Sequence, residues 1–222
     1  MPHRPNPPSH CRRCGTCCRK GGPALHQADL ALLRDKSIHR ADLITLRVGE
    51  PVHDQVKGQI ILLDAECIKI RSQDETGCCF HQPAPARQDI PNGSTTPPQG
   101  HCAIHENKPV ECAALKCWDT TDLALAAGTP RLSRLEILGK DNAMAELIRD
   151  HETHCAVADL LRHLQTPTQK SAEHLRHATT YDAALRDLLQ EKAAVPADHL
   201  PFLLGRPLSE VIQSLKRWLA MH

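Results

Sequence analysis

The stretch that decides the fold of this 222-residue chain is Cys11-Arg12-Arg13-Cys14-Gly15-Thr16-Cys17-Cys18. It places four thiols within eight residues, close enough in sequence for all of them to reach one metal centre. A tetrahedral zinc ion or an iron–sulfur cluster is held by several thiolates at once. Gly15 can take up a left-handed backbone conformation, which lets the turn approach a metal closely. The stretch therefore predicts a metal-binding protein.

The adjacent pair Cys17 and Cys18 is harder to place on one tetrahedral ion, because neighbouring side chains diverge in most backbone conformations. We expect the two thiols to bind different irons of one cluster or to face two separate sites. The remaining alternative is that one of them is a buried thiol without a ligand role.

Five further cysteines lie between residues 78 and 117. They occur in the segments Gly77-Cys78-Cys79-Phe80, His101-Cys102-Ala103-Ile104-His105, Lys108-Pro109-Val110-Glu111-Cys112 and Lys116-Cys117-Trp118. Cys112 and Cys117 are slightly more than one helical turn apart, so a helix would let both point the same way. Thiols left uncommitted in such number would be open to oxidation, which favours ligation. Cys67, Cys79 and Cys155 are better explained one by one as small buried core residues.

Taken together, the segments CRRCGTCC, GCCF and HCAIHENKPVEC resemble the YkgJ-type CxxCxxCC cysteine-cluster family, described as zinc- or iron-chelating. That family carries CxxCGxCC near its N-terminus, then a C-x-F segment, then C-x-I-Y-x-x-R-P-x-x-C. The motifs span residues 11–120 and are specific in combination. His105 stands in place of the family tyrosine, and Lys108 in place of its arginine. The resemblance implies that the metal ligands include Cys11, Cys14, Cys17, Cys18, Cys78, Cys102 and Cys112.

With Cys117 added, the expected ligands are eight thiols, which is enough for two four-cysteine sites. Two [4Fe–4S] clusters, one cluster plus a zinc ion, or two zinc ions all satisfy this number. We expect one or two [4Fe–4S] clusters, because eight thiols with one adjacent pair suit multi-iron clusters better than isolated tetrahedral ions. Zinc is the alternative cofactor.

Histidines offer a second group of ligands, since the chain has 15 of them. His151 and Cys155 are four residues apart and would share one face of a helix. Both are less favoured ligands, as is Cys79. The segment is not a zinc-protease HExxH motif, because His154 falls one residue too early for it.

Composition excludes several classes of protein. A net charge of +1 gives no electrostatic footprint for nucleic acid or an anionic membrane, and the aromatic content of 2% argues against a base-stacking surface. No window approaches the ~18 consecutive apolar residues of a membrane span. The first residues lack the apolar core of a secretory signal, so we expect a cytoplasmic protein in which thiols stay reduced. We expect its partner to be another protein.

The pattern along the chain indicates an α+β fold. We expect a disordered N-terminus over residues 1–10 and a cysteine-rich metal-binding module over 11–120, followed by a mainly helical region over 121–222 that packs on the module. Short β-branched runs predict antiparallel strands at 44–48, 60–63 and 68–70, and prolines predict a long loop at 81–100. Apolar residues at 3–4 spacing predict helices over 131–138, 142–150, 153–165, 169–194 and 208–221.

The sequence thus predicts an iron–sulfur protein that transfers electrons or serves as a cluster-bearing accessory protein. The alternative is a structural zinc module that mediates protein interaction. A weaker alternative is a cluster-dependent redox or methyl-transfer enzyme, since some relatives with the CxxCxxCC run are flagellin lysine methylases. The motifs GxGxxG, GxxxxGK[ST] and GxSxG are absent from the sequence. We therefore expect no enzyme activity of the chain by itself and name no catalytic residue.

Overall fold

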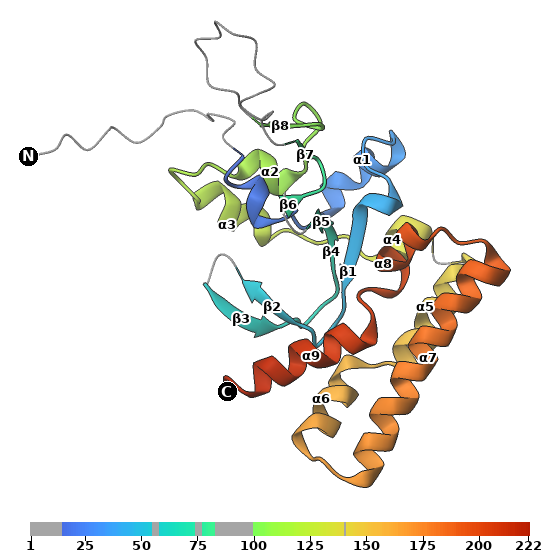
Figure 1. Cartoon of the computed structure of the whole chain (residues 1–222). Coiled ribbons are helices and arrows are strands. Elements are labelled where there is room, and N and C mark those ends of the chain that lie inside the picture. The colour runs from blue at the N-terminus through green and yellow to red at the C-terminus, as the bar shows by residue number, and fades with distance from the viewer. Residues whose placement is uncertain (1–14, 55–57, 74–76, 83–99, 140) are drawn as a thin grey trace, which may run out of the picture. The chain divides into compact units, whose positions relative to one another are not determined.

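The computed structural model describes residues 15–54, 58–73, 77–82, 100–139 and 141–222 (Figure 1). Within these ranges the chain forms two compact units. Unit 1 comprises the described residues of Met1–Ile38 and Ile70–Arg131, and unit 2 those of His39–Lys69 and Leu132–His222. The expected disordered segment at 1–10, most of the expected loop at 81–100, and the candidate ligands Cys11 and Cys14 lie outside the described residues.

Unit 1 is built from short elements joined by turns. Its elements are η1 (Cys18–Lys20), η2 (Gln27–Asp29), α1 (Leu30–Arg34), β5 (Ser72–Gln73), β6 (Gly77–Cys78), β7 (His81–Gln82), β8 (His101–Cys102), α2 (Val110–Ala114) and α3 (Thr121–Ala127). β5 pairs with β6 and β7 with β8, both antiparallel. The buried apolar side chains described for this unit are Ala24, Leu25, Ile38, Ile70, Cys78 and Ala126.

Helix α2 is shorter than the sequence suggests. It ends at Ala114, because Leu115 takes an extended conformation (φ −71°, ψ 108°). The expectation that Cys112 and Cys117 lie on one helix is therefore wrong. Cys112 is in the middle of α2, whereas Cys117 follows the helix in an exposed turn.

Unit 2 contains two strand pairs and most of the long helices. Strand β1 (Leu43–Leu46) pairs with β4 (Cys67–Ile70), and β2 (Pro51–Asp54) forms an antiparallel hairpin with β3 (Gln59–Leu62). The strands expected near 44–48, 60–63 and 68–70 are confirmed as β1, β3 and β4. β2 was not predicted, because Pro51, His53 and Asp54, none of them β-branched, occupy three of its four positions.

The helices of unit 2 confirm the helical C-terminal half. They are η3 (Arg40–Asp42), α4 (Arg134–Leu138), α5 (Ala143–His154), α6 (Val157–Gln165), α7 (Gln169–Ala193), η5 (Ala197–His199), α8 (Leu200–Leu204) and α9 (Leu208–Leu219). Polar side chains mark three starts: Ser133, Asn142 and Thr168 each accept a bond from a first-turn N–H of α4, α5 and α7. Figure 1 shows α6 and α7 lying side by side, and α9 packs against both.

The core of unit 2 lies where α6, α7 and α9 meet. It is formed by the fully or almost fully buried side chains of Cys155, Val157, Leu160, Ala178, Leu208, Val211 and Leu215. These positions repeat every three to four residues, as expected for the inner faces of packed helices. Phe202 and Leu204 of α8 are also fully buried, and α8 packs on β1.

The observed fold is α+β with short antiparallel strand pairs, as predicted. The grouping of residues is discontinuous, whereas the sequence analysis divided the chain at residue 120. Residues 39–69, which carry the first strands, belong with the C-terminal helices, and α3 belongs with the later cysteines. The packing of the helical region on a metal-binding module remains a prediction. Among the described residues, no helix has the length and apolar character that crossing a membrane requires.

Candidate metal centre

The adjacent cysteines lie on a tight helical turn. The carbonyl of Gly15 accepts the N–H of Arg19 at 2.9 Å, and that of Cys17 accepts the N–H of Lys20 at 3.1 Å. Gly21 ends the turn with φ +112°, a backbone conformation that favours glycine. The Sγ atoms of Cys17 and Cys18 are 3.9 Å apart. The expected divergence of the two side chains is therefore not observed.

Two glycines allow this turn to contact β6, which carries Cys78, and β7, which pairs with the strand of Cys102. A Cβ atom on Gly77 of β6 would lie 2.2 Å from the carbonyl oxygen of Cys18, so only glycine fits there without displacing backbone. A Cβ atom on Gly15 would lie 2.3 Å from Nε2 of His81 in β7. Both glycines also have positive φ angles, +78° and +71°. The motif glycine thus serves close packing of the turn against β6 and β7.

The strand pairs bring in two more thiols. Cys78 follows Gly77 directly, is buried, and is the register partner of Ser72. Cys102 in β8 is the register partner of His81 and is half-buried. Because the turn packs on β6 and β7, Cys78 and Cys102 come close to Cys17 and Cys18.

Three of these thiols have a raised pKa. Burial, the charge and hydrogen bond of Cys17, and the charges of Cys102 and Cys78 together raise the pKa of Cys18 to about 12. The pKa of Cys112 is also raised. Burial is the largest cause, and the charges of Cys78, Cys102, Cys18 and Cys17 follow. Burial also raises the pKa of Cys102, against the opposing hydrogen bond from the backbone of Ile104. We call Cys17, Cys18, Cys78, Cys102 and Cys112 the thiol cluster.

A thiol cluster of this kind disfavours its own ionisation and favours a cation. Each thiolate that forms is partly desolvated and repelled by the next, whereas a coordinated thiol is deprotonated by the metal charge. In the part of the chain that the structure describes, no three His, Cys, Asp or Glu side chains are already placed to hold a metal ion. The cluster supplies soft sulfur donors, which suit zinc and iron–sulfur centres.

The other cysteines predicted as ligands lie in different surroundings. Cys117 is exposed beyond the end of α2. Cys79 is half-buried between β6 and β7, where its N–H donates to the carbonyl of Arg71 at 3.0 Å. Both belong to unit 1, and their role as ligands stays a prediction.

His151 and Cys155 belong to unit 2 and are fully buried there. Nε2 of His151 is 2.8 Å from Oδ1 of Asp182, and its Nδ1 is 3.4 Å from a guanidinium nitrogen of Arg47. The thiol of Cys155 donates to the carbonyl of Ala178 at 3.6 Å. Since both ring nitrogens already face protein groups, the geometry favours a structural role for His151 over metal ligation.

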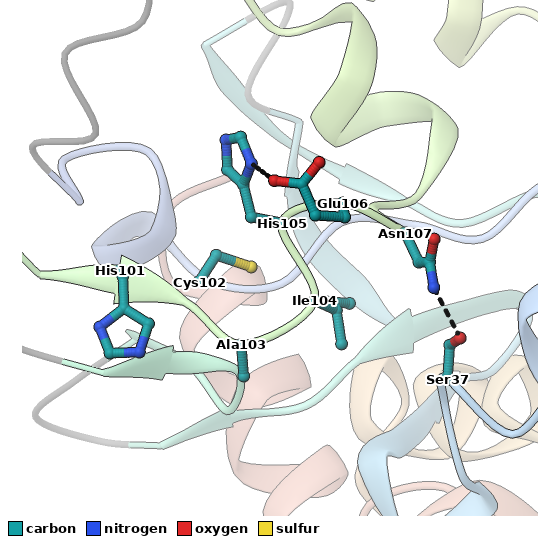
Figure 2. Close-up of a pocket in the computed structure, with 8 residues that line it drawn as sticks. All are labelled: Ser37, His101, Cys102, Ala103, Ile104, His105, Glu106 and Asn107. Carbon is teal, nitrogen blue, oxygen red and sulfur yellow. Dashed lines mark hydrogen bonds and ion pairs between the residues drawn. The ribbon is translucent and has the colours of Figure 1, made fainter.

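Cys102 also lines an open pocket of about 390 Å³ in unit 1, which sequence reasoning did not foresee. Figure 2 shows the pocket residues Ser37 and 101–107. Nδ1 of His105 lies 3.3 Å from a carboxylate oxygen of Glu106, and the amide of Asn107 donates to the hydroxyl of Ser37 at 3.3 Å. The pocket gives solvent a route to the cluster at Cys102.

Comparison of the chain with protein-family models, with curated proteins and with solved structures gave no significant match. The resemblance to the YkgJ-type family therefore stays a prediction carried by its cysteine motifs. The case for a metal centre depends on the geometry of the thiol cluster.

Proposed function

We propose that unit 1 binds a metal centre through the thiol cluster, and that the protein is an iron–sulfur protein acting in electron transfer or as a cluster-bearing accessory protein. The observation that carries this proposal is that the turn of Cys17 and Cys18 packs directly on β6, which carries Cys78, and on β7, which pairs with the strand of Cys102. Cys112 follows Glu111, whose carboxylate accepts a hydrogen bond from the segment just after that turn. Burial and the charges of neighbouring thiols raise the pKa of Cys18, Cys102 and Cys112, an arrangement that has no evident role in apolar packing alone.

The spacing of the adjacent pair refines the expected centre. Two thiolates on one tetrahedral zinc ion, each at about 2.3 Å from the metal, are separated by about 3.8 Å. The Sγ atoms of Cys17 and Cys18 are 3.9 Å apart, which fits two ligands of a single ion. In a four-cysteine [2Fe–2S] cluster two cysteines also share each iron, whereas in a [4Fe–4S] cluster each iron takes one. For this pair the geometry favours [2Fe–2S] or zinc over the [4Fe–4S] cluster expected from the sequence.

A structural zinc module that mediates protein interaction is the second candidate. The few apolar side chains that are buried among the described residues of unit 1 support it, because domains with little apolar burial commonly depend on a structural metal. Zinc would then fold unit 1, and the function would lie in the surface that the folded unit presents.

Metal and acid-labile sulfide analysis of protein purified without oxygen, together with its visible spectrum, tests both candidates. Iron and sulfide in near-equal amounts in a coloured protein support the iron–sulfur proposal. A colourless protein that holds zinc supports the structural module. A protein that retains neither metal, and takes up neither on reconstitution, contradicts both.

Two variants show whether the thiol cluster holds the metal. The double substitution Cys17→Ser with Cys18→Ser should abolish stoichiometric binding. Cys155→Ser is the matched control, because this buried cysteine lies in unit 2 and serine can keep the bond to Ala178. Equal metal content in both variants would assign the metal to other residues.

A further inference from the structure

We propose that Glu111 is a positioning residue of the metal centre: with His26 and Asp29 it fastens helix α2 so that Cys112 faces the other thiols of the cluster. The inference rests on the proposed function, since it concerns the same site. It assigns a role to a carboxylate that stands next to a candidate ligand in sequence and is itself no ligand.

The carboxylate of Glu111 is directed at the segment that follows the cysteine turn. Its Oε2 accepts the backbone N–H of Ala24 at 2.8 Å, and its Oε1 is 3.2 Å from Nε2 of His26. The side chain of His26 is 1% exposed and that of Glu111 17% exposed. Both oxygens are thus engaged in a largely buried setting, where replacing them with water is costly.

The ring of His26 is fixed from its other edge. Its Nδ1 lies 2.8 Å from the hydroxyl oxygen and 3.1 Å from the carbonyl oxygen of Thr129. The Thr129 hydroxyl also donates to the carbonyl of Ala126 at 2.7 Å, which fixes its own position. The ring of His26 is thus held between Thr129 at Nδ1 and Glu111 at Nε2.

Asp29 holds the residue before Glu111. Its Oδ1 accepts the N–H of Val110 at 2.9 Å, and its Oδ2 accepts the N–H of His26 at 2.8 Å. Val110 is the first residue of α2, and the first N–H groups of a helix have no acceptor within it. Two consecutive residues of α2 are thereby bound to the segment 24–29, and Cys112 is the next residue along the helix.

The same segment is connected to the adjacent cysteines. It begins a few residues after η1, and the N–H of Gly22 donates to the hydroxyl of Ser72 at 3.3 Å. The carbonyl of Pro23 accepts the N–H of Ile70 at 3.0 Å. Residues 22–29 thus connect the two parts of the site. They follow Cys17 and Cys18 in the chain, and they hold the helix that carries Cys112. Residues that orient ligands in this way typically contribute 10–100-fold to metal affinity.

The test uses cobalt as a spectroscopic probe, because the thiolate-to-cobalt charge-transfer absorption reports the number of thiolate ligands. We expect Glu111→Ala to lower the Co²⁺ affinity by about 10–100-fold. Its charge-transfer intensity per bound cobalt should fall by about a quarter if one of four thiolates is lost. Cys112→Ser should lose the same quarter, and Glu111→Ala should add nothing in the Cys112→Ser background, because residues that act through one another are not additive.

Two further variants separate positioning from general structure. Glu111→Gln keeps an oxygen for the N–H of Ala24 and should restore most of the intensity, and it serves as the test if Glu111→Ala does not fold. Glu106→Ala is the matched control, since this carboxylate is on the same stretch of chain and is 90% exposed. It should bind Co²⁺ like the wild-type protein.

The outcomes distinguish this inference from the proposed function. If the wild-type protein gives no thiolate-to-cobalt absorption, the proposed function fails. If the wild-type protein binds cobalt through thiolates and Cys112→Ser loses intensity while Glu111→Ala does not, the positioning role of Glu111 is overturned. If the two substitutions lower the affinity additively, Glu111 does not act through Cys112.

Discussion

Unit 2 is organised around a continuous apolar core, whereas the described residues of unit 1 bury few apolar side chains and several polar ones. The core of unit 2 joins the inner faces of α6, α7 and α9, with α8 packed on β1. In unit 1 the buried groups described include Leu25 and Ile38, but also His26, Asp29 and His81. The comparison indicates that apolar packing stabilises unit 2, whereas polar hydrogen bonds contribute more to unit 1, which we propose also depends on a metal.

Both units contain carboxylates that are buried or mostly buried, but these carboxylates have different structural roles in the two units. In unit 2 the side chain of Asp182 joins His151, Arg186 and the N–H of Leu208, so it ties α5, α7 and α9 together. In unit 1 Glu111 and Asp29 fix one short helix that carries a thiol. The first arrangement links elements that already share an apolar core, and the second orients a candidate ligand.

The largest expected effect separates the two units by their dependence on metal. Chelation should unfold unit 1 and leave unit 2 folded, because thiolate zinc sites in small peptides are worth about 10–16 kcal/mol. The two tryptophans report the units separately: Trp118 lies in unit 1 and Trp218 in unit 2. In Trp218→Phe protein the fluorescence should change on chelation, and in Trp118→Phe protein it should stay constant. Equal changes in both would remove the distinction.

A cavity in the core of unit 2 should destabilise unit 2 and leave metal binding by unit 1 unchanged. Leu215→Ala removes a fully buried side chain and should lower the unfolding free energy of unit 2 by about 2–5 kcal/mol. Denaturant unfolding followed by Trp218 fluorescence measures it. Leu188→Ala, at a position 51% exposed in the same unit, should cost less than about 1 kcal/mol. The metal content should be unchanged in both, and metal loss in Leu215→Ala would contradict the independence of unit 1.

The buried carboxylate of unit 2 gives a smaller effect. Asp182→Asn removes the charge that faces His151 and Arg186 and should cost about 2–3 kcal/mol, because hydrogen bonds to charged groups are the stronger ones. The control is Asp187→Asn, at an exposed position on the same helix. If the two variants have the same denaturation midpoint, the carboxylate does not stabilise unit 2.

The smallest effect concerns pH. Burial lowers the pKa of His151, as does the charge of Arg47, whereas its hydrogen bond to Asp182 opposes the shift. The unfolded chain takes up the proton near pH 6.5 and the folded unit only at lower pH, so stability must fall as the pH drops below about 6.5. The slope from this one group is at most about 1.4 kcal/mol per pH unit.

His151→Gln tests that slope. Its unfolding free energy, measured through Trp218 between pH 7 and 5, should depend less on pH than that of the wild-type protein. A steeper dependence in the variant would show that His151 is protonated more easily in the folded unit, contrary to its burial.

Local patterns predicted the regular elements well and the long-range contacts poorly. The 3–4 spacing found α5, α6, α7 and α9, because each buries one face. The spacing of Cys112 and Cys117 wrongly suggested that one helix carries both, because the sequence gives no signal for the extended conformation of Leu115 that ends α2. The membership of residues 39–69 in unit 2 depends on partners far along the chain, which a pattern of neighbours does not contain.

For the candidate site, the sequence likewise predicted the residue types but not their long-range contacts. All five members of the thiol cluster are among the eight cysteines that the motifs and the resemblance predict as ligands, and their ligand role stays a prediction. The shared direction of Cys17 and Cys18 could not be predicted, because it depends on the local turn that Gly15 and Gly21 permit. Glu111 stands beside Cys112, but its partner His26 is 85 residues away in the sequence. Only the fold therefore reveals the contact between them.

The measurement that tests the central claim most directly is alkylation of each cysteine in the folded protein, mapped by mass spectrometry with and without chelation. The account predicts that Cys17, Cys18, Cys78, Cys102 and Cys112 are protected in the metal-loaded protein and react once the metal is removed. Cys155, buried in unit 2, should stay protected in both states. Reaction of the exposed Cys17 and its neighbour Cys18 at full rate in metal-loaded protein would contradict the thiol cluster as the metal site.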